Sequence, residues 1–339
     1  LDSKTTKRRY DTKSIRTHIK NTNIYHLGNP ILSFIITTYN LPVVLLHECV
    51  KSIVALSLSQ QEREIILIDD GSDFCPINEL TEIASDIILV RQPNKGLSVA
   101  RNVGLKMATG KFVQFVDGDD CLINAPYEHC LDIIRYQEPV DMVMFYSASS
   151  MNQPTESSYT GPITGEEYMA NNNLRASACG YIFRRSRLGK LRFTPDIVHE
   201  DEEFTPQLVL NMHSIYCTPA KAYFYRQRKG SITHADNKEA QNKRLADIFK
   251  VILHLKDIAD GCDGVRAKSM ERRVAQLSMD FLVNVIRMTK SRKQLNHAIE
   301  LLKKHDLYPL PDNKYTPEYV IFRYLIQNKA GQLILLAAL

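Results

Sequence analysis

The stretch "KFVQFVDGDD", residues 111–120, decides the fold. Its apolar run ends abruptly at Asp117, and Asp119 and Asp120 follow at once. An apolar run of this kind is typical of a buried strand in a parallel sheet. A solvated acidic turn is the alternative for the three carboxylates, because Asp and Gly are common in turns. Such a turn would not need to follow the strand so tightly, so we expect the carboxylates to bind something.

Other apolar runs along the chain end in polar residues in the same way, and segments with helical spacing separate them. Strands that alternate with helices predict an α/β fold with a largely parallel central sheet covered by helices on both faces. The expected strands are "ILSFIITTYN" (31–40), "EIILIDDGSD" (64–73), "DIILVRQ" (86–92), residues 111–120 and "VDMVMFYSA" (140–148), and the expected helices are residues 43–58, 76–85, 97–109 and 124–137.

Three regions are predicted from the changes in composition along the chain. Residues 1–29 form a basic N-terminal tail, either a solvated segment or an arm that binds a membrane surface or a partner. Residues 30–237 form the α/β domain, with a further strand near 178–185 and short strands with a turn at 214–233. Residues 238–339 form a helical region, which we expect to support acceptor or membrane contacts rather than the chemistry.

The charge and cysteine content narrow the class of protein. The chain has 339 residues and a net charge of +5, with acids and bases mixed, which does not indicate a nucleic-acid binder. It suits an enzyme that handles anionic substrates or works near an anionic membrane surface. Seven scattered cysteines without a CxxC pair indicate reduced thiols, and neither a signal peptide nor a membrane-spanning run is visible. A cytoplasmic location, with peripheral association at the inner membrane face, is therefore expected.

The strand ends should meet, because ligands of such sheets bind at the carboxyl ends of the strands. Asp117, Asp119 and Asp120 have no neighbouring His or Cys, and carboxylates of this kind suit Mg²⁺ or Mn²⁺. Such an ion can bridge carboxylates and the phosphates of a nucleotide. Asp70 could accept hydrogen bonds from a base or a ribose, or form an Asx turn. Tyr39 could stack on a base, or pack in the protein.

Basic residues could hold phosphates near the same edge. Lys95 and Arg101 flank the expected start of a helix, where free N–H groups bind anions. Arg226 and Arg228 in "YRQRKGSIT" (225–233) could clamp a diphosphate through paired donors. Ordinary surface charges are the alternative in both places.

An acidic segment, "HEDEEF" (199–204), has four acids in consecutive positions, 200–203. Acids favour helix N-termini through the helix dipole, so a structural role is one interpretation. The other is that one of these carboxylates is a general base held near the metal site.

The order of these motifs resembles that of the family-2 glycosyltransferases, which have the GT-A fold. The resemblance covers about residues 31–235 and rests on five stretches in the family's order. They are "LSFIITTYN", "IILIDDGSD", "NKGLSVARNVGLKMATGKFVQFVDGDD", "HEDEEF" and "YFYRQRKGSIT". A nucleotide-sugar donor, expected to be a UDP-sugar, and a divalent metal ion are implied by this resemblance.

The resemblance also implies roles for single residues. Tyr39 and Asp70 correspond to residues that hold the base of the donor, and Thr37 lies beside the nucleotide. Asp117 and Asp119 are similar to the ends of the family's DxD motif, which Asp120 extends. Asp201 is similar to the catalytic base, which takes a proton from an acceptor hydroxyl so that transfer inverts the anomeric configuration.

Differences from the family limit the function. The processive members carry a QxxRW motif and membrane helices, whereas this chain has no Trp. Transfer of one or a few sugars to a growing glycan or a lipid-linked acceptor therefore fits better than polymer synthesis coupled to export. A Rossmann dehydrogenase is disfavoured because no GxGxxG follows the first strand. A nucleotidyltransferase and a non-catalytic sugar-nucleotide-binding subunit remain open alternatives.

Overall fold

The structure is a computed structural model that describes residues 30–75, 80, 83, 86–155, 157–228 and 238–339. The basic tail and most of the expected helix at 76–85 lie outside these residues. A single sheet runs through the molecule in the order β3-β2-β1-β4-β8-β6-β9-β5, with β7 paired to β9. The strands are β1 (Leu32–Thr38), β2 (Arg63–Asp69), β3 (Ile87–Arg91), β4 (Phe112–Asp117), β5 (Cys121–Leu122), β6 (Met142–Ala148), β7 (Thr160–Ile163), β8 (Tyr181–Arg184) and β9 (Ile215–Phe224).

The parallel half of the sheet brings the strand ends level with one another. Strands β3, β2, β1 and β4 pair in parallel, and Thr37 of β1 lies opposite Asp117 of β4. On its other side β1 places Thr38 opposite Asp69 of β2. Strands β1, β2 and β4 are almost wholly buried because helices cover both faces, which explains their apolar runs. The predicted α/β fold, with a mostly parallel sheet flanked by helices, is confirmed.

The other half of the sheet is mixed. β8 inserts between β4 and β6 and runs antiparallel to both. β9 then pairs in parallel with β6, and a short β5 and β7 pair antiparallel to β9. The segment 214–233, expected as short strands and a turn, contains one strand of ten residues in β9. In sequence, β8 of this half is the last strand before the acidic segment at residues 199–204.

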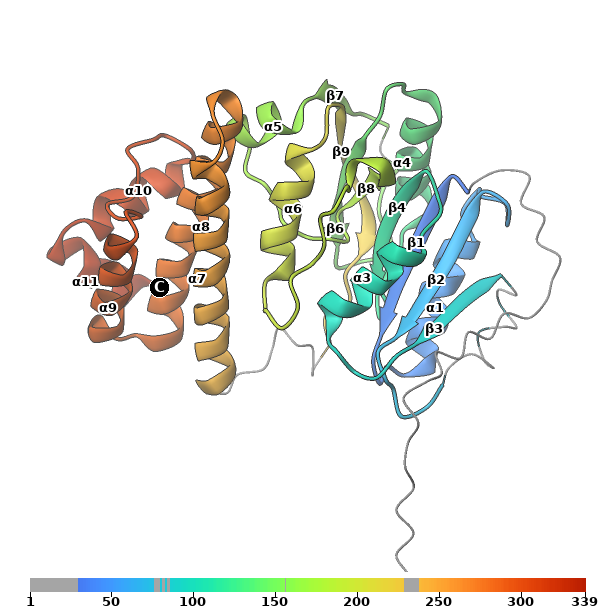
Figure 1. Ribbon diagram of the computed structural model, residues 1–339, viewed down its shortest axis with the longest axis horizontal. Helices are drawn as coiled ribbons and strands as arrows, with labels where there is room; N and C mark the ends of the chain where they lie inside the picture. The colour runs from blue at the N-terminus through green and yellow to red at the C-terminus, as the bar shows by residue number, and fades with distance from the viewer. Residues whose placement is uncertain (1–29, 76–79, 81–82, 84–85, 156, 229–237) are drawn as a thin grey trace, which may run out of the picture.

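The helices divide between the sheet and the C-terminal region. Figure 1 shows α7 to α11 gathered at one end of the molecule and β3 at the opposite end, so the predicted C-terminal helical region is confirmed. The helices are α1 (Val43–Val54), α3 (Leu97–Met107), α4 (Asn124–Tyr136), α5 (Gly165–Asn171), a 3₁₀ turn (Arg185–Arg187), α6 (Glu200–Leu210), α7 (Lys238–Asp260), α8 (Gly264–Thr289), α9 (Arg292–Lys304), α10 (Pro317–Ile326) and α11 (Lys329–Ala338).

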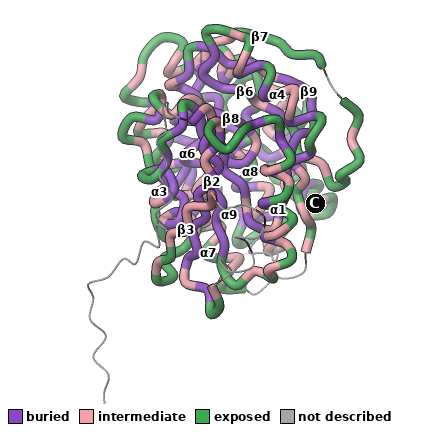
Figure 2. The backbone as a smooth tube through the Cα atoms, turned by 90° about the vertical axis from the view of Figure 1, so that its right-hand side faces the viewer, coloured by how far each residue is buried: buried purple, intermediate pink, exposed green. Residues whose placement is uncertain are grey.

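The sheet and the C-terminal helices share one apolar core. Figure 2 shows buried backbone running through both, with exposed segments at the periphery. Helix α8 packs against α5 and α6 of the α/β part as well as against α7 and α9. The helical region is therefore joined to the sheet by a packed interface, which includes the acidic helix α6.

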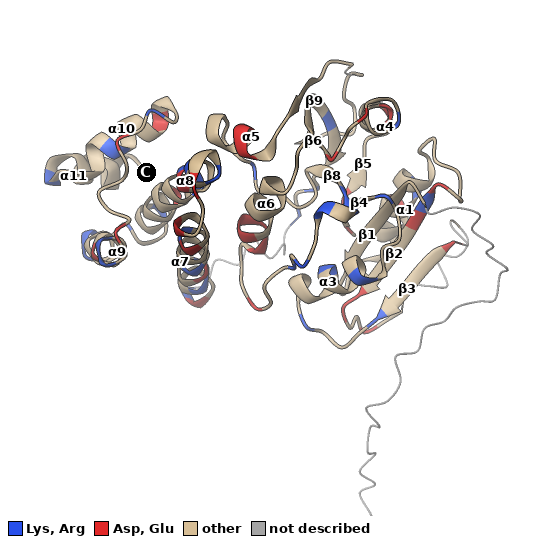
Figure 3. Ribbon diagram, turned by 45° about the horizontal axis from the view of Figure 1, so that its top comes forward, with Lys and Arg blue, Asp and Glu red and all other residues tan. Residues whose placement is uncertain are grey.

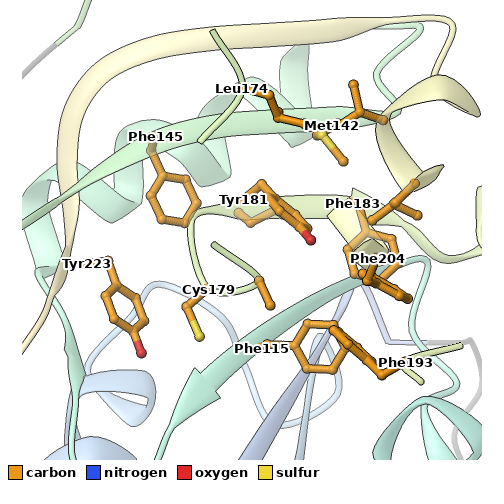
Figure 4. Packing of buried hydrophobic residues seen from close by; sticks show 14 of the residues in the cluster. Phe115, Met142, Phe145, Leu174, Cys179, Tyr181, Phe183, Phe193, Phe204 and Tyr223 are labelled. Carbon is orange, nitrogen blue, oxygen red and sulfur yellow. The ribbon is translucent and has the colours of Figure 1, made fainter. Parts of the chain in front are cut away.

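Aromatic rings in the core form a floor beneath the strand ends. Phe193 and Phe204 stack with ring centroids 3.8 Å apart, and Phe115 of β4 meets Phe193 edge-on at 5.4 Å. Figure 4 shows these three rings grouped together. Phe204 belongs to α6, so this cluster ties the acidic helix to the strand that ends in Asp117.

Candidate active site

Asp70 folds the loop that follows β3 back onto the end of β2. Its carboxylate accepts hydrogen bonds from the backbone N–H groups of Lys95 (2.9 Å) and Gly96 (2.8 Å) and from the Gln92 amide (2.6 Å). Gly71 has a φ of 87°, and a Cβ there would lie 2.6 Å from the backbone nitrogen of Asn94. The carboxylate predicted to hold the base therefore also shapes the loop at residues 92–96.

The start of α3 lies at the end of this loop. Gly96 precedes the helix with a φ of 85°, a left-handed conformation that glycine adopts without strain, and no side chain caps the helix. Uncapped N–H groups and the positive end of the helix dipole can receive a phosphate. Lys95 is exposed beside them. This geometry agrees with the phosphate role predicted for Lys95.

Arg101 connects the strand edge to the acidic helix. Its buried guanidinium donates to the Asp117 carboxylate at 3.1 Å and to the Glu200 carboxylate at 2.8 Å. It lies over the rings of Phe115 and Phe193. Burial opposes its charge, but the two carboxylates outweigh burial and raise the pKa of Arg101. Arg101 is thus a fixed positive charge between two sets of acids, where a developing negative charge would be stabilised.

The acidic strand end is held by a tyrosine from β9. The Tyr223 hydroxyl accepts the backbone N–H of Asp117 at 3.1 Å and donates to the Asp120 carboxylate at 2.8 Å. The other oxygen of Asp120 accepts the backbone N–H of Arg226 at 2.8 Å. Burial, and then the nearby charge of Asp117, raise the pKa of Asp120 to about 7. Both carboxylate oxygens of Asp120 thus accept hydrogen bonds from the protein, which fix the turn.

Asp117 and Asp119 remain available at the surface of the site. The Asp117 side chain is 34% exposed, and only one of its oxygens accepts a hydrogen bond from a described residue. Asp119 similarly uses one oxygen, toward Arg228 at 2.6 Å. In the described part of the chain, no group of three His, Cys, Asp or Glu side chains is placed to hold a metal ion. Two carboxylates still fit Mg²⁺, which often takes one or two from the protein and the rest from phosphates and water.

The two arginines after β9 lie over the same turn. Arg226 donates to the carbonyl oxygen of Asp119 at 2.8 Å and to the carboxylate of Glu48 at 2.6 Å. Arg228 uses its Nε atom for Asp119. Each is only partly exposed, with side chains 26% and 31% accessible. The structure thus brings both beside Asp119, although ion pairs with protein carboxylates occupy part of their donor capacity.

Thr37 and Tyr39 lie at and just beyond the end of β1. Thr37 is buried beside Asp117, the residue with which it pairs in the sheet. Tyr39 is 51% exposed, so its ring is accessible to a ligand. The roles predicted for Tyr39, in stacking on a base, and for Thr37, beside the nucleotide, stay predictions.

Asp201 lies in the first turn of α6. Its neighbours are all engaged: Glu200 with Arg101, Glu202 with Arg273 and Glu203 with His254. None of the described side chains donates a hydrogen bond to the carboxylate of Asp201. Burial and the charge of Glu200 outweigh Arg101 and raise the pKa of Asp201 to about 7. This value suits a general base, which is most effective when its pKa is near the working pH. Figure 3 shows the acidic start of α6.

Comparison with known proteins agrees with this geometry. Residues 33–189 match the family model described as glycosyl transferase family 2. This part of the chain belongs to glycosyl transferase family 2. This chain is 29% identical over 237 residues to the uncharacterized glycosyltransferase EpsJ of Bacillus subtilis, a match that covers 64% of this chain and 67% of EpsJ.

Two other relatives are much longer than the region they share with the family-2 glycosyltransferase. The glycosyltransferase GlyA of Streptococcus pneumoniae is 28% identical, over 60% of this chain and 31% of GlyA. The minor teichoic acid biosynthesis protein GgaB of Bacillus subtilis is 24% identical, over 64% of this chain and 26% of GgaB. The chain thus spans about a third or less of the length of these two relatives.

Solved structures share the fold of the family-2 glycosyltransferase. TarS of S. aureus (residues 1–349), in complex with UDP-GlcNAc, superposes with a TM-score of 0.59 at 18% identity, covering 87% of this chain and 91% of that 1–349 chain. The mannosyltransferase PcManGT of Pyrobaculum calidifontis, in complex with GDP-Man and Mn²⁺, gives 0.57 at 15% identity, covering 92% and 85%. Both coverages extend beyond the matched family region into the C-terminal helices.

Tyr223 and Glu200 were not among the predicted site residues. Tyr223 joins Asp117 and Asp120 of the acidic turn, and Glu200 shares Arg101 with Asp117. The segment around Tyr223 has the alternation of an ordinary strand, so the sequence does not mark its hydroxyl as special. Glu200 could be found from its position beside the predicted base.

Proposed function

We propose that the protein transfers a sugar from a nucleoside-diphosphate sugar to an acceptor hydroxyl, with inversion at the anomeric carbon. The observation that carries the proposal is the Arg101 bridge, which places the DxD carboxylate Asp117 and the first turn of α6 on one guanidinium. A donor bound at the strand edge would thereby have its diphosphate near the carboxylates and its anomeric carbon toward Asp201.

The donor would bind along the strand ends. The ring of Tyr39 stacks on the base, the loop ordered by Asp70 surrounds the nucleoside, and Lys95 and the start of α3 face a phosphate. Arg226 and Arg228 move from their carboxylate partners to the diphosphate when it binds. The donor that we propose is a UDP-sugar.

A divalent ion, Mn²⁺ or Mg²⁺, would be held by Asp117 and Asp119 and would neutralise charge on the departing diphosphate. Asp201 takes the proton of the acceptor hydroxyl. The acceptor oxygen forms its bond to the anomeric carbon as the bond to the diphosphate oxygen breaks, and the nucleoside diphosphate leaves with the electron pair. Arg101 stays in place and offsets the negative charge around this step.

The acceptor that we propose is a growing surface glycan or a lipid-linked oligosaccharide. The support is the similarity to GgaB, whose name assigns it to minor teichoic acid biosynthesis. Within the described residues, every helix is too short or too polar to cross a bilayer. Any contact with a lipid-linked acceptor would therefore involve a peripheral surface of these residues.

A donor panel tests the proposal. The purified protein is incubated with UDP-GlcNAc, UDP-glucose, UDP-galactose and GDP-mannose in manganese buffer, and the released phosphates are identified. We expect a nucleoside diphosphate from one donor, and its loss with EDTA. Release of pyrophosphate from a nucleoside triphosphate in the presence of a sugar phosphate would instead identify a nucleotidyltransferase. Nucleotide binding without any release would identify a non-catalytic binding subunit.

A further inference from the structure

The loop that leads into α6 has an unusual backbone. Asp196 and His199 both adopt positive φ values, of 61° and 74°, although neither is glycine. His199 is the residue that immediately precedes α6, so its left-handed conformation sets the direction in which the first turn leaves the loop. Such conformations are sparsely populated by residues other than glycine and persist only where the surroundings impose them.

Helix α7 imposes the conformation of this loop. The buried Asp247 carboxylate accepts the backbone N–H of Val198 at 3.1 Å, and it also accepts from Lys243 at 2.5 Å and Lys250 at 3.0 Å. Lys243 in turn donates to the carbonyl oxygen of Asp196 at 2.7 Å. The carbonyl oxygen of Asp196 and the N–H of Val198 are thus both tied to one charged cluster on α7.

Helix α8 holds the first turn of α6 from another direction. The Arg273 guanidinium, whose side chain is 6% exposed, donates to the carboxylate of Glu202 and to the carbonyl oxygen of Leu174 at 3.0 Å. His254 of α7 contacts Glu203 at 2.5 Å. Both acids beyond Asp201 therefore have partners from the C-terminal helices.

The result is an asymmetric first turn. Glu200 is held by Arg101 from the sheet side, and Glu202 and Glu203 are held by the C-terminal helices. Asp201, between them, receives no hydrogen bond from a side chain among the described residues. Because a misplacement of 1 Å can cost about 10²-fold in rate, the contacts that fix this turn affect the chemistry without touching the substrate.

We propose that Arg273 and Asp247, in the C-terminal helical region, are positioning residues that aim Asp201 at the acceptor. This inference rests on the proposed function, in which Asp201 is the base. It changes the role expected for residues 238–339, which becomes part of the catalytic arrangement as well as a possible surface for acceptors.

The test compares two adjacent buried arginines of α8. Arg272 also donates to a backbone carbonyl, that of Ala170 at 2.9 Å, and to Asn173 at 3.0 Å, but it has no hydrogen bond to α6 among the described residues. The variants are Arg273→Gln, Arg273→Lys and Arg272→Gln, with Asp247→Asn as an independent change on α7. Each is measured for melting temperature, UDP affinity in manganese, kcat and KM with the donor that the panel selects, and amide hydrogen exchange of residues 196–204.

We expect Arg273→Gln and Asp247→Asn to lower kcat about tenfold or more, with UDP affinity changed less than threefold and faster exchange in residues 196–204. Arg273→Lys should restore part of kcat because it keeps a charge that can reach Glu202. Arg272→Gln should lower the melting temperature without either effect. Equal effects of the two Gln variants on kcat and exchange, or unchanged exchange in Arg273→Gln, would overturn the inference.

Asp201→Asn, measured in parallel, separates this inference from the proposed function. If Asp201→Asn keeps wild-type turnover, the assignment of the base is wrong, whatever Arg273→Gln does. If Asp201→Asn is inactive while Arg273→Gln and Asp247→Asn keep wild-type kcat, the proposed function stands and the positioning role is wrong.

Discussion

At the scale of single residues, the site separates carboxylates that stay accessible from one that the protein encloses. The sequence places three carboxylates within four residues, at Asp117, Asp119 and Asp120, and does not distinguish their roles. In the fold, Asp120 is buried against Tyr223 and the Arg226 backbone, while the other two stay partly accessible. The partners of Asp120 lie more than a hundred residues away, so no local pattern could distinguish it.

Asp201 should give the transfer rate a characteristic dependence on pH. A carboxyl with a pKa of about 7 is protonated below that pH and cannot accept a proton, so kcat/KM should fall about tenfold per pH unit below it. Asp201→Asn should cost about 10²–10⁴-fold in rate and remove this limb of the profile. Glu202→Gln and Glu203→Gln, which test a mere helix-dipole role, should keep the limb. A wild-type rate that is flat from pH 5 to 8 would contradict the assignment.

The same raised pKa should appear in the stability of the protein. Between pH 4 and 7 the folded Asp201 binds a proton that the unfolded chain has released, so this residue makes the protein less stable as pH rises through that range. Asp201→Asn removes this loss of stability at high pH. The variant should therefore gain stability relative to the wild type at pH 8 compared with pH 4, measured by denaturant unfolding at both values. An equal difference at the two pH values would show that the pKa of Asp201 is not raised.

Tyr223 should matter for the shape of the acidic turn. Tyr223→Phe leaves the buried Asp120 oxygen and the Asp117 N–H without their partner, which typically costs about 1–3 kcal/mol. We expect weaker manganese-dependent UDP binding as well, measured by calorimetry. Tyr136→Phe is the control, because its side chain is exposed on α4. A Tyr223→Phe variant with wild-type stability and UDP affinity would show that the hydroxyl is dispensable.

At the scale of elements, strands β1, β2 and β4 were predicted within a few residues, because burial on both faces leaves a continuous apolar run. The place of β8 between β4 and β6 was not predicted. Strand pairing depends on contacts between distant segments, and nothing in "YIFR" specifies its two neighbours. The link from α8 to α6 escaped prediction for the same reason, since Arg273 resembles any other arginine of an amphipathic helix.

The conformation of the loop at residues 92–96 depends on the carboxylate of Asp70, which directly follows β2. Asp70→Asn replaces one of the two acceptor oxygens by an NH₂ group and removes the charge, so the side chain can no longer accept the N–H groups of Lys95 and Gly96 on separate oxygens. Hydrogen bonds to a charged group are worth about 1.5–3 kcal/mol each, so the loop should open locally. We expect faster amide exchange at Lys95 and Gly96 and weaker UDP binding, with a smaller change in the exchange of β1. Unchanged exchange at both amides, with UDP affinity lost, would show that Asp70 acts on the nucleotide directly.

At the scale of the whole molecule, the sheet and the helical region should unfold together. Both contribute to one apolar core, and α8 joins them through its contacts with α5 and α6. The boundary predicted at residue 237 divides the sequence by composition, whereas the packing continues across it. Residues 229–237 themselves lie outside the described part of the chain.

A core substitution in α8 tests whether the sheet and the helical region unfold together. Leu282→Ala removes a fully buried side chain and should cost about 2–5 kcal/mol. Tryptophan is absent, so unfolding is followed by circular dichroism and by tyrosine fluorescence. We expect one transition that shifts equally for both probes. Leu333→Ala, at an exposed position of α11, should change stability by less than about 0.5 kcal/mol. Two separate transitions, with only one shifted, would show that the helical region unfolds independently.

The hydrogen bonds of Tyr223 to the acidic turn also have a consequence for synthesis of the protein on the ribosome. The parallel strands β1 to β4 end at Asp117, so they can pair early as the chain emerges. The turn at Asp120 acquires its partners only when Tyr223 and Arg226 have been made, about a hundred residues later. A nascent chain that stops between these points carries the family's acidic motif without the strand that shapes it. Nucleotide binding should thus arrive late in translation, after most of the sheet already exists.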